Sequence, residues 1–179
     1  MAEKEEFAVI LDFLPYGYPL EKKTMPIAHA IGKKNFTLLE LVPRRGMKFD
    51  AGEEVYIGEG KRDKVYYILG KLEFNKMSET AKKLLEEYIA KQISSDEKKF
   101  VEFFNKAQPI NTRLHQLELI PGFGKKHTQA ILSEREKKPF ESLEELRHRI
   151  TNLPDPKTAV IKRIVEELKG EERHPIFMY

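Results

Sequence analysis

The chain has 179 residues, of which 40% are hydrophobic and 34% charged, with 32 Lys and Arg against 29 Asp and Glu. This length suits one or two domains. No apolar run reaches the roughly 18 residues that a membrane span needs, and the acidic N-terminus lacks the apolar core of a signal peptide. Without cysteine, the chain can form neither a disulfide framework nor a Cys-ligated zinc site. We therefore expect a soluble, cytoplasmic protein that does not contact membranes.

The net charge of +3 is too small to identify a nucleic-acid partner by itself. A site for phosphate groups would therefore have to be a local cluster of cations. The high charged fraction, together with few Asn and Gln residues, is typical of heat-adapted proteins. We accordingly expect a thermostable protein.

Short β-strands are predicted throughout the first domain, residues 1–76. Their predicted ranges are residues 5–14, 27–31, 36–42, 55–58 and 65–74. The first is apolar on both faces, which suits the middle of a sheet or a barrel. No helical pattern of 10–15 residues separates the strands, so a parallel βαβ sheet is not expected. Five short strands in so few residues predict a small five-stranded OB-like β-barrel.

A helical bridge is predicted over residues 77–110. Ser78 can cap a first helix whose apolar residues share one face. The Ser94-x-x-Glu97 pattern is a capping box that opens a second helix. The aromatic residues of this second helix indicate packing rather than ligand recognition, since such residues are usually buried.

Four helices in two pairs are predicted over residues 111–170 of a third domain, residues 111–179. Asn111 is expected to cap the first helix and Ser142 the third. Asp155 and Pro156 suit the start of the fourth helix, and Gly170 its end. The predicted fold class is therefore α+β and multidomain, with an OB-like barrel, a helical bridge and a C-terminal all-α domain.

The strongest functional pattern lies where the first pair of helices turns. Gly122 and Gly124 flank Phe123, which we expect to plug into the core, while both glycines take positive φ. The helix that follows begins with unpaired N–H groups and a partial positive charge, which together suit an anion. Lys125 and Lys126 add positive charge, and His127 could also touch a phosphate. The alternative is an ordinary helical turn with a glycine cap.

This stretch resembles the helix-hairpin-helix motif, which grips nucleic-acid phosphates through hairpin N–H groups. The matching residues are Leu117, Ile120, Gly122, Phe123, Gly124, Ile131 and Leu132. Thr128 departs from the motif, where a smaller Ala is usual, and could loosen the helix packing slightly. The second pair lacks the glycines and carries Asp155, so we expect it to be a structural partner in a tandem helix-hairpin-helix domain.

The whole chain also resembles an uncharacterised archaeal family of predicted nucleic-acid-binding proteins. Four segments carry the resemblance: LDFLPYGYP near the start, GEEVYIG at 52–58, FVEFFNKAQPI ending at Ile110, and LHQLELIPGFGKKH at 114–127. The resemblance implies an OB-like barrel followed by a helix-hairpin-helix domain, and a role with nucleic acid. It implies no established activity.

The loops of the predicted barrel form a second set of candidate nucleic-acid contacts. The cationic candidates are Lys22, Lys23, Arg44, Arg45, Lys61, Arg62 and Lys64, and the candidates for base stacking are Tyr16, Tyr18, Tyr56 and Tyr66. Single-strand binders combine aromatic side chains with cations in this way. In the alternative, Tyr16 and Tyr18 pack under their own loop and the cations are ordinary solvated residues. The outward direction of Tyr56 and Tyr66 depends on strand register.

No enzyme motif is found. The five histidines are scattered without metal-ligand spacing, and neither a P-loop nor a G-x-S-x-G sequence occurs. We expect no cofactor, no metal and no catalytic residue. The predicted function is non-enzymatic binding of nucleic acid, with RNA slightly favoured over DNA by analogy. The alternatives are a protein-interaction adaptor in a ribosomal or DNA-repair assembly and an unrecognised nuclease.

Overall fold

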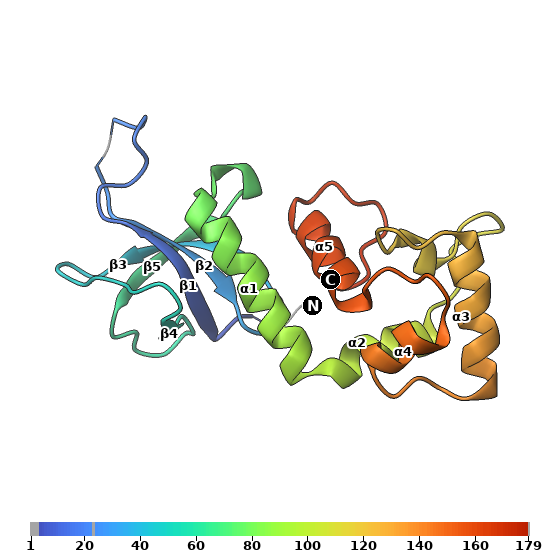
Figure 1. Cartoon of the computed structure of the whole chain (residues 1–179). Coiled ribbons are helices and arrows are strands. Elements are labelled where there is room, and N and C mark those ends of the chain that lie inside the picture. Colours follow the sequence, from blue (N-terminus) through green and yellow to red (C-terminus); the bar gives the residue numbers. More distant parts are fainter. Residues whose placement is uncertain (1–3, 23, 179) are drawn as a thin grey trace. The chain divides into compact units, whose positions relative to one another are not determined.

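The computed structural model describes residues 4–22 and 24–178, which form one β-sheet and a set of helices (Figure 1). Its contacts divide the chain into two compact units. The sheet unit contains the described residues up to Glu86 and those from Glu167 onward, and the helical unit is Glu87–Glu166. The predicted division at residues 76 and 110 stays a prediction, and the two units are described separately.

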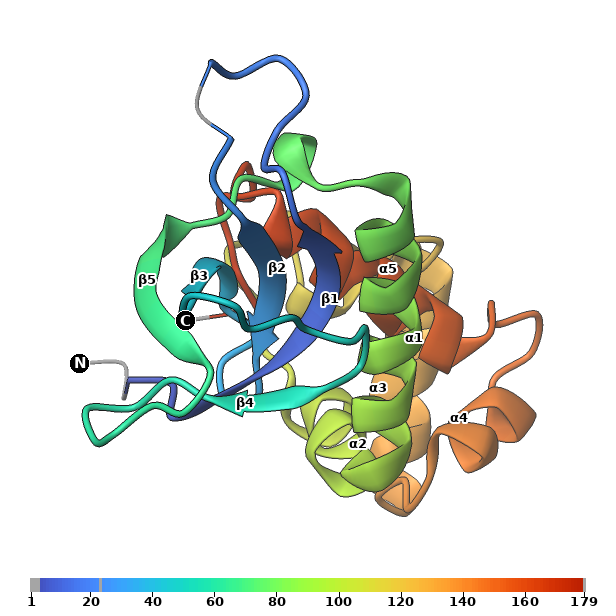
Figure 2. The ribbon, with the colours of Figure 1, turned by 90° about the vertical axis from the view of Figure 1, so that its left-hand side faces the viewer.

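Five strands form the sheet, and all five predicted strands are confirmed. They are β1 (Phe7–Leu14), β2 (Ile27–Gly32), β3 (Leu38–Pro43), β4 (Glu54–Tyr56) and β5 (Val65–Lys71). Their order is β4-β1-β2-β3-β5, and each neighbouring pair is antiparallel. Figure 2 shows the sheet curling so that β4 and β5 lie at its two ends.

The predicted five-stranded OB-like barrel is wrong, because the sheet is a curled half-barrel. Among the described residues, β4 pairs only with β1 and β5 only with β3. β4 has only three residues and is followed at Gly58 by a loop in which the Gly60 N–H donates to the Tyr56 hydroxyl at 3.0 Å. Because the chain turns back on β4 there, the strand ends before it could pair with β5.

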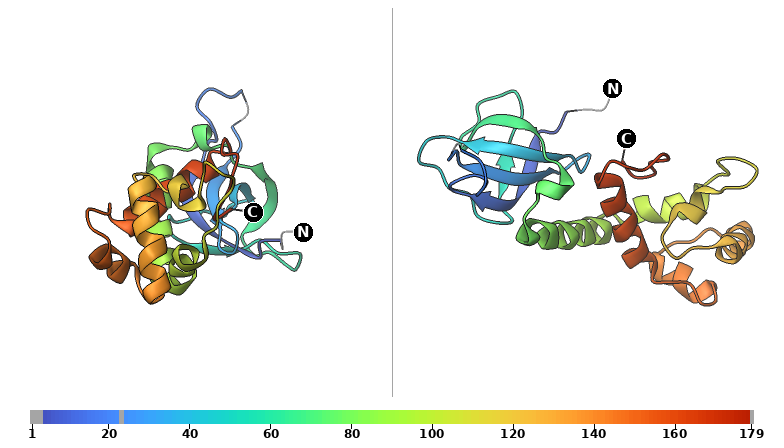
Figure 3. Two further views of the ribbon diagram at one scale, coloured as in Figure 1. Left: turned by 90° about the vertical axis from the view of Figure 1, so that its right-hand side faces the viewer. Right: turned by 90° about the horizontal axis from the view of Figure 1, so that it is seen from above.

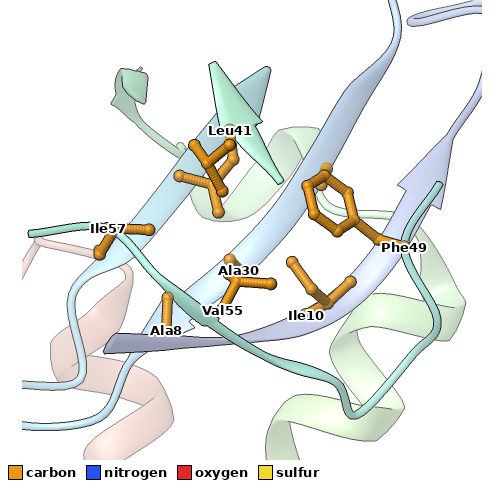
Figure 4. Packing of buried hydrophobic residues seen from close by; sticks show 9 residues of the cluster. Ala8, Ile10, Ala30, Leu41, Phe49, Val55 and Ile57 are labelled. Carbon is orange, nitrogen blue, oxygen red and sulfur yellow. The ribbon is translucent and has the colours of Figure 1, made fainter. Parts of the chain in front are cut away.

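The core of the sheet unit fills the concave side of the sheet. Its members alternate along the strands with residues of the other face, as the period of two requires. Figure 4 shows the cluster, in which Ala8, Ile10, Ala30, Leu41, Phe49, Val55 and Ile57 are labelled. β2 is buried at all six positions, which places it in the middle of the unit.

The helices are α1 (Glu79–Ser95), α2 (Glu97–Lys106), α3 (Lys125–Lys137), α4 (Leu143–Arg149) and α5 (Pro156–Leu168), seen from two further sides in Figure 3. Two short 3-10 turns, η1 (Phe74–Lys76) and η2 (Gln116–Leu119), complete the described elements. None of the helices in the described ranges is both long and apolar enough to cross a bilayer.

The helix predicted after Asn111 is wrong. The Asn111 carboxamide accepts the N–H groups of Arg113 and Leu114, and this local turn competes with helix formation. Further along, the His115 ring accepts the Leu117 N–H at 3.1 Å and caps η2 instead. The predicted all-α tandem domain is therefore wrong as well, because its first helix is a 3-10 turn and its last residues belong to the sheet unit. The α+β class is confirmed.

Most predicted helix caps are confirmed. Ser78 accepts the Ala81 N–H, Ser142 accepts the Glu145 N–H, and Asp155 accepts the Thr158 N–H. The capping box at Ser94 is wrong. Its hydroxyl accepts a hydrogen bond from the Lys157 ammonium, and α2 begins after Asp96 without a side-chain cap.

Candidate functional site

The glycine corner, residues 120–124, turns the chain from η2 into α3. Gly122 has φ +84°, a conformation that favours glycine, and the Phe123 N–H donates to the Ile120 carbonyl at 3.0 Å. Phe123 is 4% exposed, with its ring centroid 5.9 Å from that of Phe104. The buried ring therefore anchors the corner while the glycines stay at the surface.

Gly124 does not take the predicted positive φ. Its φ of −98° and ψ of −170° are extended backbone, and a Cβ added there would meet nothing within 4 Å. The reason is that Gly124 is the residue before the first helical turn, where extended backbone is usual. Its lack of a side chain affects access to the helix start rather than the conformation of the turn.

The first amides of α3 lie directly beside this open surface. Within the described residues, the backbone N–H groups of Lys125 and Lys126 have no protein acceptor, and both side chains are exposed. The Gly124 N–H donates to His127 Nδ1 at a long 3.4 Å. Thr128, where Ala was the expected residue, is buried, and its hydroxyl donates to the Gly124 carbonyl at 3.0 Å. The helix start therefore offers N–H groups and two ammonium groups to an anion.

A second turn, at residues 151–155, lies against the glycine corner. His127 Nε2 is 3.1 Å from the Asn152 carbonyl oxygen, and a Cβ on Gly122 would stand 3.1 Å from Pro154 Cγ. The Asp155 carboxylate accepts from the Thr158 hydroxyl and N–H, and these bonds hold the Asp155 pKa below its usual value. The second turn thus supports the corner and orients His127.

Arg149 is a residue near this corner that the sequence analysis missed. It lines a cavity of about 440 Å³ together with Lys126, His127 and Asn152. Its guanidinium forms ion pairs with Glu145 at 3.0 Å and Glu134 at 3.4 Å. No motif marks Arg149, because a lone Arg near a helix end is a common surface residue.

The two basic loops of the sheet unit, predicted separately, lie side by side. Arg44 Nε donates to the Arg62 carbonyl at 2.7 Å, and the Arg44 N–H donates to the Lys64 carbonyl at 2.8 Å. Arg45 and Lys61 are exposed. The Lys64 ammonium pairs with Glu53, which lowers the Glu53 pKa. The structure therefore brings these cations together, with Lys64 already paired.

The loop after β1 does not bring its predicted residues together in one site. Tyr16 is 78% exposed and Lys22 is exposed, whereas Lys23 lies outside the described residues. Tyr18 is half-buried with its hydroxyl 3.0 Å from His29 Nε2. Burial, and then the nearby Glu40 carboxylate, raise the pKa of Tyr18. The Tyr18 ring therefore packs within the sheet unit, against His29 of β2, whereas Tyr16 is exposed, and a binding role for either tyrosine stays a prediction.

The two strand tyrosines differ in their surroundings. Tyr66 is 63% exposed and contacts the Tyr67 ring at 5.3 Å. Tyr56 packs edge-on against Phe7, with ring centroids 5.4 Å apart, and accepts the Gly60 N–H. Tyr56 lies beside a groove of about 1160 Å³ whose lining residues Phe7 and Lys33 the sequence analysis did not select. The Lys33-Lys34 pair after β2 is the signal that could have marked it.

Two of the histidines, His29 and His115, are buried. Burial lowers the pKa of both His29 and His115, so the neutral ring is favoured in each. No group of three or more His, Cys, Asp or Glu residues in the described part of the chain has the geometry to hold a metal ion.

The chain is similar to a family of unknown function and to individual proteins from two organisms. A family model described as "Protein of unknown function (DUF655)" matches residues 4–179. An uncharacterized protein of Methanocaldococcus jannaschii is 38% identical over 175 residues, which are 98% of this chain and 79% of that protein. The crystal structure of Af1531 from Archaeoglobus fulgidus, of the same family, is 42% identical and superposes with a TM-score of 0.85, covering 98% of this chain and 100% of that one. The predicted resemblance to an uncharacterised archaeal family is confirmed at this level.

Proposed function

The chain belongs to the DUF655 family, and we propose that it is a non-enzymatic nucleic-acid-binding protein that holds a backbone phosphate at the glycine corner. The observation that carries this proposal is the start of α3. There the N–H groups of Lys125 and Lys126 lie beside Gly124, whose missing side chain leaves the approach open. A helix start of this kind attracts phosphate through N–H donors and the helix dipole.

The geometry supports phosphate contact without base recognition. The exposed donors are main-chain groups and flexible lysines, and such groups position a nucleic acid without reading its sequence. Separately, the cations of the sheet unit, Arg44, Arg45, Lys61 and Arg62, provide a second contact surface of the same kind. We therefore expect an affinity that depends strongly on salt concentration and weakly on the nucleotide sequence. The affinity is measured for both RNA and DNA.

The test is charge reversal at the start of α3. The double variant Lys125→Glu with Lys126→Glu is compared with Lys137→Glu plus Lys138→Glu, which makes the same change of net charge at the other end of the helix, roughly 18 Å away. Fluorescence anisotropy with labelled RNA and DNA at several salt concentrations measures the affinity. The first variant should bind more weakly and lower the salt slope by about one to two, whereas the second should bind as the wild type does. Equal slopes for all three proteins would remove the corner from the interface.

A protein-interaction adaptor is the second candidate, and β5 supports it. This strand ends the sheet and exposes Tyr66, Leu69 and Tyr67 at 63%, 43% and 37%. An edge strand with exposed apolar residues is a template for pairing with another chain. Affinity capture from native extract with nuclease treatment, followed by crosslink mapping, separates the candidates. Crosslinks to β5 that survive digestion would favour the adaptor.

A further inference from the structure

The open side of the half-barrel contains a groove, which we call the seam groove, with a volume of about 1160 Å³. Its apolar lining consists of Phe7, Leu39, Tyr56, Ile57 and Ile68, and its polar lining includes Lys4, Glu5, Glu6, Lys33, Lys34, Asn35, Thr37, Glu59 and Arg62. Leu39 and Ile68 also pack against the core cluster. The floor of the groove is thus a continuation of the core surface, left uncovered because β4 and β5 do not meet.

Two aromatic rings form a fixed platform in this groove. Phe7 and Tyr56 are cross-strand partners of β1 and β4, and their rings contact edge to face. Phe7 is 40% exposed, which is unusual for a large apolar side chain. The Tyr56 hydroxyl is held by the Gly60 N–H, so the ring is positioned before any ligand arrives. An exposed, rigid aromatic face suits the stacking of a planar base.

A guanidinium group is positioned beside this platform. Arg62 Nε donates to the Gly58 carbonyl at 2.8 Å, and the Arg62 carbonyl accepts from Arg44 Nε at 2.7 Å. Within the described residues, the two terminal NH₂ groups of Arg62 donate no hydrogen bond to the protein. A guanidinium fixed through its Nε presents a planar pair of donors, which matches the geometry of a phosphate.

Four cationic side chains line the groove against three carboxylates, and one of these cations, Lys33, pairs with Glu54 at 2.6 Å. The Glu5 carboxylate accepts the N–H groups of Lys34 and Asn35, and Glu59 pairs with Lys4 at 2.9 Å. These bonds engage two of the three lining carboxylates, and Glu6 is the remaining one. The Lys4–Glu59 pair is highly exposed, so it is weak and a phosphate could replace its carboxylate.

We propose that the seam groove binds a single-stranded stretch of nucleic acid, with bases against Phe7 and Tyr56 and a phosphate on Arg62. This inference rests on the proposed function and specifies its substrate as single-stranded. Bases inside a duplex are already stacked and cannot present their faces to the aromatic pair. The groove volume exceeds the 300–1,000 Å³ typical of small-molecule sites, which fits a run of nucleotides rather than one.

The test uses the full chain and labelled homopolymers, oligo-U and oligo-dT, on the order of ten nucleotides long. Phe7→Leu keeps the apolar volume but removes the aromatic face, and Arg62→Lys keeps the charge but removes the fork. Matched controls are Phe74→Leu, at a partly exposed phenylalanine that does not line the groove, and Arg113→Lys, at an exposed arginine that does not line it either. Circular dichroism confirms that each variant is folded.

Each groove variant should weaken binding of the single strands by about threefold to tenfold, whereas both controls should bind as the wild type does. Equal affinity in the groove variants, or equal losses in the controls, would overturn the proposal. A second copy of this chain or a peptide could occupy the seam groove instead, and sedimentation or crosslinking would detect that complex. If such a complex forms and Phe7→Leu leaves oligonucleotide binding unchanged, the proposal is likewise overturned.

The corner and the groove can fail independently. Loss of salt dependence in the Lys125→Glu, Lys126→Glu variant concerns the corner, whereas the Phe7→Leu and Arg62→Lys results concern the groove. Both sets of variants are measured with oligo-U, with oligo-dT and with an added duplex of equal length, so the failure of one proposal is distinguishable from the failure of the other.

Discussion

Gly122 and Gly124 are two residues apart, yet substitution by alanine is expected to destabilise the protein at Gly122 and to leave its stability nearly unchanged at Gly124. Gly122 has φ +84°, and an added Cβ would stand 3.1 Å from Pro154 Cγ. Forcing an L-residue into the left-handed region costs about 1–2 kcal/mol. The contact with Pro154 adds to this cost unless the ring can shift. We therefore expect Gly122→Ala to lower the free energy of unfolding by about 1–2 kcal/mol or more.

Gly124→Ala is the matched control. Its extended backbone accepts an L-residue, and nothing lies within 4 Å of the added Cβ. Alanine restricts the unfolded chain, a gain of about 0.4–1 kcal/mol, but it is a poorer residue than glycine at this helix-start position, a loss of similar size. The two effects nearly cancel, and we expect a change in stability of less than about 0.5 kcal/mol. The new methyl group covers the approach to the Lys125 amide, so phosphate binding should weaken.

Thermal unfolding followed by circular dichroism measures both variants. For a chain of this size, 1 kcal/mol shifts Tm by about 2–4 °C, so Gly122→Ala should melt at least a few degrees below the wild type. Gly124→Ala should melt close to the wild type and lose affinity for RNA and DNA. Equal melting temperatures for the two variants, or unchanged binding by Gly124→Ala, would refute this account of the corner.

Three further predictions concern other parts of the chain. The Glu167 carboxylate accepts the N–H groups of Ile176, Phe177 and Met178 at 2.6, 3.0 and 2.9 Å. Glu167→Gln should therefore lower the free energy of unfolding by about 1–2 kcal/mol and speed hydrogen exchange at these three amides. Unchanged exchange rates would contradict this prediction. Because the Asp155 pKa is lowered in the folded protein, its cap on α5 is fully stabilising above pH 3.8 and is lost as pH falls through the lower folded pKa. Asn is also a good cap but does not titrate, so Asp155→Asn should reduce the loss of stability at acidic pH, measured as unfolding free energy against pH. The same loss in variant and wild type would contradict this role of Asp155. The lowered His115 pKa predicts stability that declines as pH falls below 6.5, and His115→Gln should reduce that decline in urea unfolding between pH 7 and 5.

Local patterns predicted much of the secondary structure because the relevant forces act within a few residues. The five strands follow from runs of apolar residues bounded by turn residues, and the caps at Ser78, Ser142 and Asp155 follow from side chains next to the helices that they start. The burial of Phe123 between two surface glycines also followed from the sequence. Asn111 failed as a helix cap because the same carboxamide can close a local turn, and propensity alone does not separate the two.

The candidate sites depended more on distant contacts. The loops containing Arg44 and Arg62 are far apart in sequence, and only the pairing of β3 with β5 places them side by side. The sequence predicts Phe7 as a core residue in an apolar strand, yet it is 40% exposed and lines the seam groove, a place that depends on how the whole sheet curls.

The amino-acid sequence by itself determined where the strands lie, where most helices start, and that a glycine corner precedes α3, because hydrophobic period and capping chemistry are properties of neighbouring residues. Only the tertiary structure decided that the sheet stays open, that its seam exposes an aromatic pair beside Arg62, and that Gly122 rather than Gly124 needs a left-handed backbone. These features depend on register and on contacts between segments far apart along the chain, and such contacts leave no local pattern to read.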